Sequence, residues 1–259
     1  MPQRSFLRYQ LQNSLRHLPA SLSLFESVLD TDVEVLQQHL SDFEKHRKEN
    51  VLRLQQQNGE AICKLQGKRV LFLGDSLTAD ELGYRPLVCE AAGLLARNGA
   101  ISGATSASLF NLCRQKILSK TSPIPDILSI MLGTNDSVSI EREELHQVSL
   151  AENARNMREI LSWGQKIGTR VLLFAIPPIL ERQFCTHVAA TGKLHSNRAI
   201  DAYNAELATI ADGLGIPLIT HLPPHDDPTL FEADGLHWSI EGQARFAAQW
   251  LKAAANIIQ

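Results

Sequence analysis

The sequence lacks several features that mark particular classes of protein. It has four cysteines, which stand singly with no CxxC pair. This excludes a zinc knuckle, a thioredoxin-type motif and a disulfide scaffold. No stretch is apolar over the length of a membrane span, and the N-terminus has no secretory apolar region with a cleavage site. We therefore expect a soluble cytoplasmic protein without integral membrane association. We also expect reduced core thiols at Cys63, Cys89, Cys113 and Cys185.

Charge of one sign is also not in excess. The chain has 25 Lys and Arg against 28 Asp and Glu, for a formal charge of −3, so the composition does not favour a nucleic-acid or anionic-membrane partner. Hydrophobic residues make up 44% and charged residues 20%, which is typical of a globular chain and not of a disordered one. Its 259 residues suffice for one sizeable core, or for one domain with an appendage.

Residues 1–66 carry helical patterns without strand-like runs, so we expect a helical extension before a domain spanning 67–259. A capping box at Thr31 to Glu34 predicts the start of one helix. The extension either packs as a hairpin on its own domain or serves dimerisation or partner docking, so a homo-oligomer formed through these helices is left open. The apolar residues at helical spacing are Leu7, Leu11, Leu15 and Leu18, then Leu36, Leu40, Phe43, Val51 and Leu54.

The remainder alternates short apolar runs with longer amphipathic helical patterns. Near-continuous apolar runs predict strands buried on both faces, which is typical of parallel sheets. A capping box from Ser149 to Glu152 predicts the start of one helix, and the last helix is expected to begin near Ser239. The alternation indicates an α/β doubly wound parallel sheet, whose ligands bind beyond the carboxyl ends of the strands. The runs are Arg69 to Gly74, Asp126 to Leu132 and Arg170 to Ile176, with weaker candidates at Leu94 to Ala100 and Ile216 to Thr220.

Gly74-Asp75-Ser76-Leu77 follows the first predicted strand and precedes a helix. A serine at this turn presents its hydroxyl at the carboxyl edge of the sheet, beside amides that can receive negative charge. Ser76 is therefore a candidate nucleophile. The motif is short, and a serine there is also a good helix N-cap.

Gly133-Thr134-Asn135-Asp136 directly follows the strand Asp126 to Leu132. The side-chain amide of Asn135 can donate a hydrogen bond to an oxyanion without carrying a charge. Taken alone, the same residues favour an ordinary Asx turn.

Asp234-Gly-Leu-His237 precedes the last predicted helix. A carboxylate three residues before a histidine can accept from Nδ1 and leave Nε2 to take a proton. His237 is therefore a candidate base and Asp234 its orienting partner. His221 and His225 are spaced like a metal-binding pair, but two prolines between them exclude a helix, and we expect no metal site.

Together these residues supply every role that acyl transfer through a serine ester requires. In their order, the GDSL, G-x-N-D and D-x-x-H blocks resemble those of the SGNH hydrolases, also called GDSL-type esterases and lipases, from Arg69 to about Leu251. The resemblance implies a three-layer α/β/α flavodoxin-like fold, no metal or organic cofactor, and hydrolysis of a small-molecule ester or thioester. It implies an oxyanion hole of the Ser76 and Gly103 amides with the Asn135 side chain, Gly99 being the alternative glycine.

Two other functions stay open at this point. An O-acyltransferase would use the same residues with a different acceptor, and a noncatalytic binding protein would use the fold alone. The substrate is also open among acetylated carbohydrates, short-chain lipids and thioesters. Trp238 and Phe184 are candidates for lining an acyl pocket, and the long connection Pro177 to Asn197 is a candidate lid.

Overall fold

A computed structural model of the chain describes residues 33–114, 123–140, 142–181, 193–220, 224 and 226–258. Its centre is a five-stranded sheet in the order β2-β1-β3-β6-β8, with every neighbouring pair parallel. In chain order of these five strands, this is the 2-1-3-4-5 arrangement of flavodoxin-like folds. All five predicted strands are therefore confirmed, the first with its predicted bounds and the other four with shorter ones: β1 (Arg69–Gly74), β2 (Leu95–Asn98), β3 (Ile127–Met131), β6 (Arg170–Phe174) and β8 (Leu218–Ile219).

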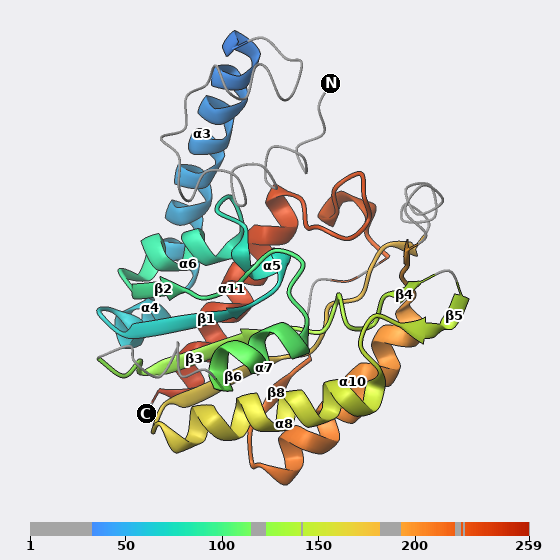
Figure 1. Cartoon of the computed structure of the whole chain (residues 1–259). Helices are drawn as coiled ribbons and strands as arrows, with labels where there is room; N and C mark the ends of the chain where they lie inside the picture. Colours follow the sequence, from blue (N-terminus) through green and yellow to red (C-terminus); the bar gives the residue numbers. More distant parts are fainter. Residues whose placement is uncertain are drawn as a thin grey trace.

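Alternating residues along the central strands enter two separate cores. Val70 and Phe72 of β1 face one core, whereas Leu71 and Leu73 face the other, as the two-residue period of a strand requires. Figure 1 shows helices on both sides of the sheet, and the predicted three-layer α/β/α architecture is confirmed. One layer contains α3 (Val33–Gln57), α4 (Gly59–Leu65), α6 (Tyr84–Ala92) and α11 (Ile240–Ile257), and the other α7 (Ser106–Arg114), α8 (Leu150–Lys166) and α10 (Asn197–Gly213).

The predicted starts of α8 and α11 are confirmed, and a serine caps each helix. The Ser149 hydroxyl accepts from the Glu152 amide at 3.3 Å at the start of α8. The Ser239 hydroxyl accepts from the Gly242 amide at 3.2 Å at the start of α11. These contacts satisfy donors in the first turn that have no partner within the helix. The predicted helix at Leu7 to Leu18 and the capping residue Thr31 lie outside the described residues.

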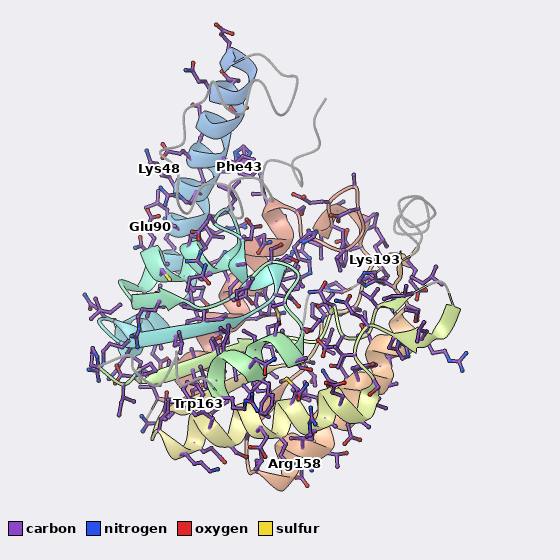
Figure 2. All side chains as sticks on the ribbon, in the orientation of Figure 1. Phe43, Lys48, Glu90, Arg158, Trp163 and Lys193 are labelled. Carbon is purple, nitrogen blue, oxygen red and sulfur yellow. The ribbon has the colours of Figure 1, made fainter. Side chains whose placement is uncertain are left out.

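Helices α3 and α4 share a core with the sheet. Val51, Leu54 and Leu65 are buried in the same cluster as residues of α6 and α11. Phe43, labelled in Figure 2, is also buried on α3, and the salt bridge from Arg47 to Glu90 of α6 measures 2.8 Å. This described part of the extension thus packs on its own chain, while a domain boundary at residues 66 and 67 stays a prediction.

Two features of the structure were not predicted or were predicted differently. A small antiparallel sheet has the order β5-β4-β7; β4 and β7 have only two residues each, and the five residues of β5 are mostly charged, so none carries a strand pattern. Cys113 is buried as expected, but Cys63 is exposed, so the expectation of a core thiol is wrong there. Among the described helices, none is long and apolar enough to cross a membrane. The bounds of the small sheet are β4 (Ser139–Ile140), β5 (Arg142–His146) and β7 (Lys193–Leu194).

Candidate active site

Ser76 is the first residue of the short helix α5 (Ser76–Ala79), which begins where β1 ends. The preceding Asp75 caps this helix, because its carboxylate accepts from the Leu77 amide at 3.1 Å. Gly74 is required at the turn, since a Cβ there would lie 2.5 Å from the Met131 carbonyl oxygen of β3. The turn therefore sits tightly against β3 and directs Ser76 to the carboxyl edge of the sheet. The backbone amide of Ser76, first in its helix, has no carbonyl four residues back in that helix to bond.

Asp234, His237 and Ser76 form a continuous chain of hydrogen bonds. Asp234 Oδ2 lies 2.7 Å from His237 Nδ1, and His237 Nε2 lies 3.0 Å from Ser76 Oγ. Asp234 Oδ1 also accepts from the backbone amides of Leu236 and His237, each at 2.9 Å. The structure thus brings together three residues that lie up to 161 positions apart in the sequence.

The ionisation of Asp234 determines which nitrogen of His237 carries the proton. Burial raises the pKa of Asp234, but the His237 ring, its charge and the two amides outweigh burial and hold the pKa at about 2. An ionised carboxylate can only accept, so Nδ1 of His237 must be the donor. In the neutral ring, Nε2 then has its lone pair facing the Ser76 hydroxyl.

The loop that carries His237 is held by backbone hydrogen bonds. The Glu232 amide donates to the His237 carbonyl oxygen at 2.8 Å, and Phe231 pairs with Trp238 in an antiparallel bridge. Leu180, just beyond β6, donates its amide to the Gly235 carbonyl oxygen at 2.8 Å. Trp238, a candidate for lining an acyl pocket, is fully buried and packs on a core phenylalanine, so it serves the core.

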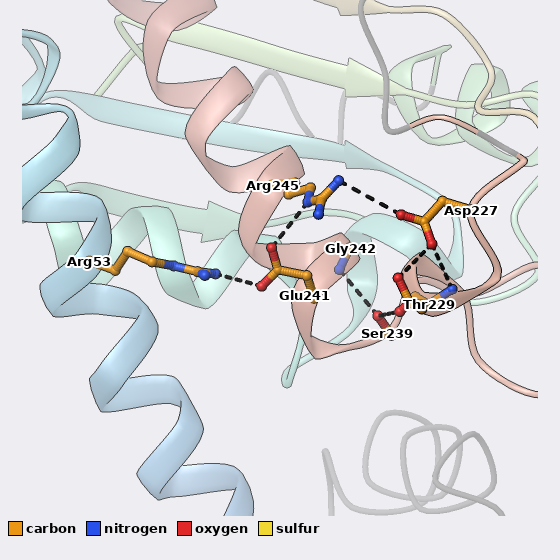
Figure 3. Close-up of polar contacts among 7 residues, drawn as sticks. All are labelled: Arg53, Asp227, Thr229, Ser239, Glu241, Gly242 and Arg245. Carbon is orange, nitrogen blue, oxygen red and sulfur yellow. Dashed lines mark hydrogen bonds and ion pairs between the residues drawn. The ribbon is translucent and has the colours of Figure 1, made fainter.

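Charged side chains extend this support to the N-terminal helix. Figure 3 shows Glu241 in the first turn of α11 between Arg53 of α3, at 2.9 Å, and Arg245, at 3.0 Å. The Asp227 carboxylate caps the 3-10 helix Pro228–Leu230, accepting from the Thr229 amide at 3.0 Å. These ion pairs are partly exposed, so each stabilises the fold by about 1 kcal/mol at most.

The two loops expected to supply an oxyanion hole contact each other and the end of β1. Asn135 Nδ2 donates to the Ala104 carbonyl oxygen at 3.0 Å, and the Ile101 amide donates to the Gly74 carbonyl oxygen at 3.1 Å. Because an amide nitrogen carries two hydrogens, Asn135 keeps one N–H for another acceptor.

Gly103 fits the expected backbone donor better than Gly99 does. Its φ is +76°, a conformation that glycine adopts without strain, and its amide has no backbone partner among the described residues. The Gly99 amide, by contrast, donates to the Phe72 carbonyl oxygen at 2.8 Å and so continues the pairing of β1 and β2. That amide is therefore engaged, which disfavours the alternative assignment.

Asp75, beside the nucleophile, is fully buried. Burial raises its pKa to about 6, although the Leu77 amide, the Thr134 hydroxyl and the charge of His237 each lower it. Its negative charge in turn favours a protonated His237 ring. The sequence pattern assigned the possible N-cap role to Ser76 and none to Asp75, whose capping of α5 and electrostatic coupling to His237 emerge from the structure.

His195 is a residue near the site that the sequence pattern did not single out. Burial lowers its pKa to about 4, as do the charges of Lys193 and His237, whereas Asp234 raises it. The ring is therefore neutral at physiological pH and lies within electrostatic reach of the Asp234–His237 pair. It follows β7, whose two residues carry no strand signal, so no sequence pattern would have found it.

Besides the hydrogen-bonded chain of Asp234, His237 and Ser76, the sequence and the structure offer a few other candidate sites. No group of three His, Cys, Asp or Glu side chains in the described residues is arranged to hold a metal ion. A cavity of about 610 Å³ lies between α3, the loop after α5 and the start of α11, among Phe43, Leu82 and Ile240, and no residue of the hydrogen-bonded chain lines it. Phe184, His221, His225 and most of the candidate lid, residues 182–192, lie outside the described residues.

Comparison with known proteins supports the interpretation of the GDSL, G-x-N-D and D-x-x-H blocks. The model of the GDSL-like Lipase/Acylhydrolase family matches residues 72–245, which is more than half of the chain. The chain belongs to this family. The matched segment contains Ser76, Asp234 and His237 and the two loops expected to supply an oxyanion hole, and it confirms the resemblance to the SGNH hydrolases. As a member, the protein is an enzyme that hydrolyses ester bonds.

Solved structures share the fold of this GDSL-like chain. A GDSL-like lipase from Bacteroides thetaiotaomicron has a TM-score of 0.56 at 21% identity, covering 73% of this chain and 88% of its own. An acetylxylan esterase from Geobacillus stearothermophilus has a TM-score of 0.54 at 21% identity, covering 74% and 96%. An alpha/beta hydrolase from the metagenome of Lake Arreo has a TM-score of 0.54 at 19% identity, covering 75% and 97%. No curated protein matches the sequence.

Proposed function

We propose that the protein is a serine esterase that hydrolyses carboxylic esters through a covalent acyl intermediate on Ser76. The observation that carries this proposal is the chain of contacts from Asp234 to His237 at 2.7 Å and from His237 to Ser76 at 3.0 Å. Both distances lie within the reach that proton transfer requires. The groups also have the right chemical character. The ionised Asp234 carboxylate accepts from Nδ1 of His237 and so leaves Nε2 facing the Ser76 hydroxyl.

In the first step, Ser76 Oγ attacks the acyl carbonyl carbon while its proton passes to His237 Nε2. The carbonyl π electrons move to the carbonyl oxygen, which becomes an oxyanion. When this oxygen re-forms its double bond, the bond to the alcohol breaks and the proton on Nε2 passes to the departing alkoxide. The products are a free alcohol and an acyl ester on Ser76.

In the second step, water replaces the alcohol. His237 Nε2 takes a proton from the water as its oxygen attacks the acyl carbon, and a second oxyanion forms. Collapse breaks the bond to Ser76 Oγ, which regains its proton from His237. The carboxylic acid leaves, and the enzyme returns to its starting state.

The oxyanion of both steps is bound by the amides of Ser76 and Gly103 and by the second N–H of Asn135. Ser76 is 8% exposed, so little water screens its amide, whereas Asn135 is half-buried and Gly103 is exposed. The donors are fixed before substrate binds, because Asn135 already bonds Ala104 and Ser76 begins a helix. Preorganised donors of this kind favour the charged intermediate over the neutral ester.

The direct test is hydrolysis of p-nitrophenyl acetate and butyrate by the wild type, Ser76→Ala and the control Ser41→Ala, whose hydroxyl is exposed on α3. Intact-mass detection of a fluorophosphonate adduct follows the nucleophile directly. Wild type and Ser41→Ala should turn over and label, and Ser76→Ala should do neither. Labelling of folded Ser76→Ala, or a folded wild type that neither labels nor turns over, contradicts the proposal. A new ester formed with added alcohol would reveal acyl transfer by the same residues.

Two further sequence predictions accompany this proposal. A cytoplasmic location is tested by fractionating cells that produce the protein. Association of copies through the N-terminal helices is tested by sedimentation of the full chain. A monomer at micromolar concentration would contradict that association.

A further inference from the structure

Asp136 is a buried carboxylate that directly follows Asn135 and has no part in the proton transfers described above. It is 0% exposed. Its two oxygens accept from the Ser106 amide at 3.1 and 2.9 Å, and one of them also accepts from Asn153 Nδ2 at 2.9 Å. The Ser106 hydroxyl donates to the same carboxylate in a short hydrogen bond.

These partners come from two helices of one layer. Ser106 begins α7, three residues after Gly103, and Asn153 lies in the first turn of α8. Asn156 of α8 completes the cluster by donating to the Ser106 hydroxyl at 3.2 Å. Asp136 therefore joins the loop after β3 to the helix that follows the Gly103 loop, and it braces both against α8.

Consecutive side chains thus hold the two oxyanion loops together. Asn135 bonds the Ala104 carbonyl oxygen at 3.0 Å, and Asp136 bonds the Ser106 amide at 2.9 Å. The backbone between these two contact points follows directly from Gly103. A shift of α7 relative to the β3 loop would move the Gly103 amide and the Asn135 amide apart.

Stability alone does not account for a carboxylate at this place. Removing a charge from water costs several kcal/mol, and an apolar cluster of similar volume is often equally stable or more stable. Burial accordingly raises the pKa of Asp136, although the hydrogen bonds from Asn153 and Ser106 lower it. What a carboxylate provides, and an apolar side chain does not, is several acceptor positions on one rigid plane for donors from two helices.

We propose that Asp136 is the positioning residue of the oxyanion hole, holding the Gly103 loop at a fixed distance from Asn135. The inference rests on the proposed function, because it assigns Asp136 to the same oxyanion. Asp136 touches neither substrate nor the transferred proton. It acts through Ser106 and through the loop that it shares with Asn135.

The test is Asp136→Asn, which keeps the size of the side chain but replaces one acceptor with a donor. Three donors, the amide and hydroxyl of Ser106 and the amide of Asn153, then compete for the remaining oxygen. We expect kcat for p-nitrophenyl acetate to fall about 10- to 100-fold with KM changed less than about twofold, because the oxyanion exists only beyond the ground state.

A double-mutant cycle with Asn135→Ala separates positioning from general loss of packing. If Asp136 acts through the oxyanion hole, the double variant should lose much less than the product of the two single losses, because the donor is already gone. Multiplicative losses, or a kcat for Asp136→Asn within about twofold of wild type, would overturn the proposal.

The matched control is Ser129→Ala in β3, which removes a buried hydrogen bond of 2.9 Å from Trp250 but lies in the opposite core. It should lower Tm and leave kcat unchanged. If Asp136→Asn does not fold, Ser106→Ala replaces it, and an unchanged kcat there overturns the proposal. Fluorophosphonate labelling of wild-type Ser76 separates the two levels, since its absence contradicts the proposed function itself, whereas labelling with a normal kcat in the variants contradicts only the role of Asp136.

Discussion

The Asn135 side chain donates to the carbonyl oxygen of Ala104 at 3.0 Å and so joins the loop after β3 to the loop after β2. These two strands are not neighbours, because β1 lies between them. The hydrogen bond therefore crosses above the end of β1, where Ser76 begins α5. It thereby joins the two loops that supply donors in the proposed oxyanion hole.

Replacing Asn135 should remove catalysis without unfolding the protein. We expect Asn135→Ala to lower kcat about 100- to 1000-fold, because one donor to the oxyanion is lost, with little change in KM. Esterase kinetics together with Tm provide the measurement. Asn256→Ala, exposed on α11, is the control and should match wild type. A kcat unchanged in Asn135→Ala would remove this amide from the site.

Two glycines with the same backbone geometry separate strain from function. Gly103 has φ of +76° and Gly93 has φ of +58°, and a Cβ at either position meets no atom within 4 Å. Alanine should cost about 1 kcal/mol at each, because both left-handed conformations become strained. Only Gly103→Ala should also lower kcat, since it displaces a donor amide. Equal rates for the two variants would argue that Gly103 is a turn residue alone.

The buried Asp75 predicts a pH-dependent gain in stability. Its pKa is raised to about 6, chiefly by burial, against about 3.9 in the unfolded chain. The stabilising contribution of the protonated form is thus complete below about pH 4 and lost as pH rises through 6. Asp75→Asn keeps an acceptor for Leu77 and should raise the free energy of unfolding at pH 7.5 by about 2 kcal/mol, with little change at pH 4. Urea unfolding at both values measures this, and the exposed Asp201→Asn is the control.

The same substitution should shift the pH dependence of catalysis. Activity should decline on acidification, because a protonated His237 cannot take the proton of Ser76. The charge of Asp75 favours that protonated ring, so its removal should move the acidic limb of kcat/KM to lower pH by up to about one unit. A profile that moves to higher pH, or that is flat from pH 5 to 8 in the wild type, would contradict the assignment of His237 as base.

The N-terminal helix should prove part of the core. Leu54 is 1% exposed and Leu52 is 59% exposed on the same helix, α3. We expect Leu54→Ala to lower the free energy of unfolding by about 2–5 kcal/mol and Leu52→Ala by less than about 0.5 kcal/mol. Chemical denaturation of the full chain compares them. Two small, equal losses would mean that α3 is dispensable for the fold.

The parts of the fold that sequence predicted are those with strong local patterns. The apolar runs of β1, β3 and β6 predicted a parallel sheet. A strand covered by helices on both faces buries the side chains of both faces, so it lacks the alternation of apolar and polar residues. The capping box at Ser149 and the expected start near Ser239 predicted two helices, and in the structure both serine oxygens accept from first-turn amides. The small sheet was missed because β4 and β7 have only two residues each, and the five residues of β5, REELH, are mostly charged and show no apolar alternation.

The residues of the candidate site also divide into those that short sequence motifs predicted and those whose roles needed the structure. Ser76, Asn135, Asp234 and His237 were found because each lies in a short motif at the end of a strand or before a helix. Gly103 was preferred over Gly99 by resemblance alone, and the structure supports this choice because the Gly99 amide is already bonded to Phe72. Trp238, an open candidate for a pocket, proved to be a core residue.

The sequence by itself determined the sheet, its helical layers and the chemical types that gather at the carboxyl edge, because periodicity, capping and residue chemistry are local properties. Only the tertiary structure decided which groups touch. The 2.7 and 3.0 Å contacts of His237, the burial that raises the pKa of Asp75 to about 6, and the cluster around Asp136 all join segments far apart in the chain. Contact distance and desolvation depend on packing from every side, and no stretch of sequence contains all of those sides.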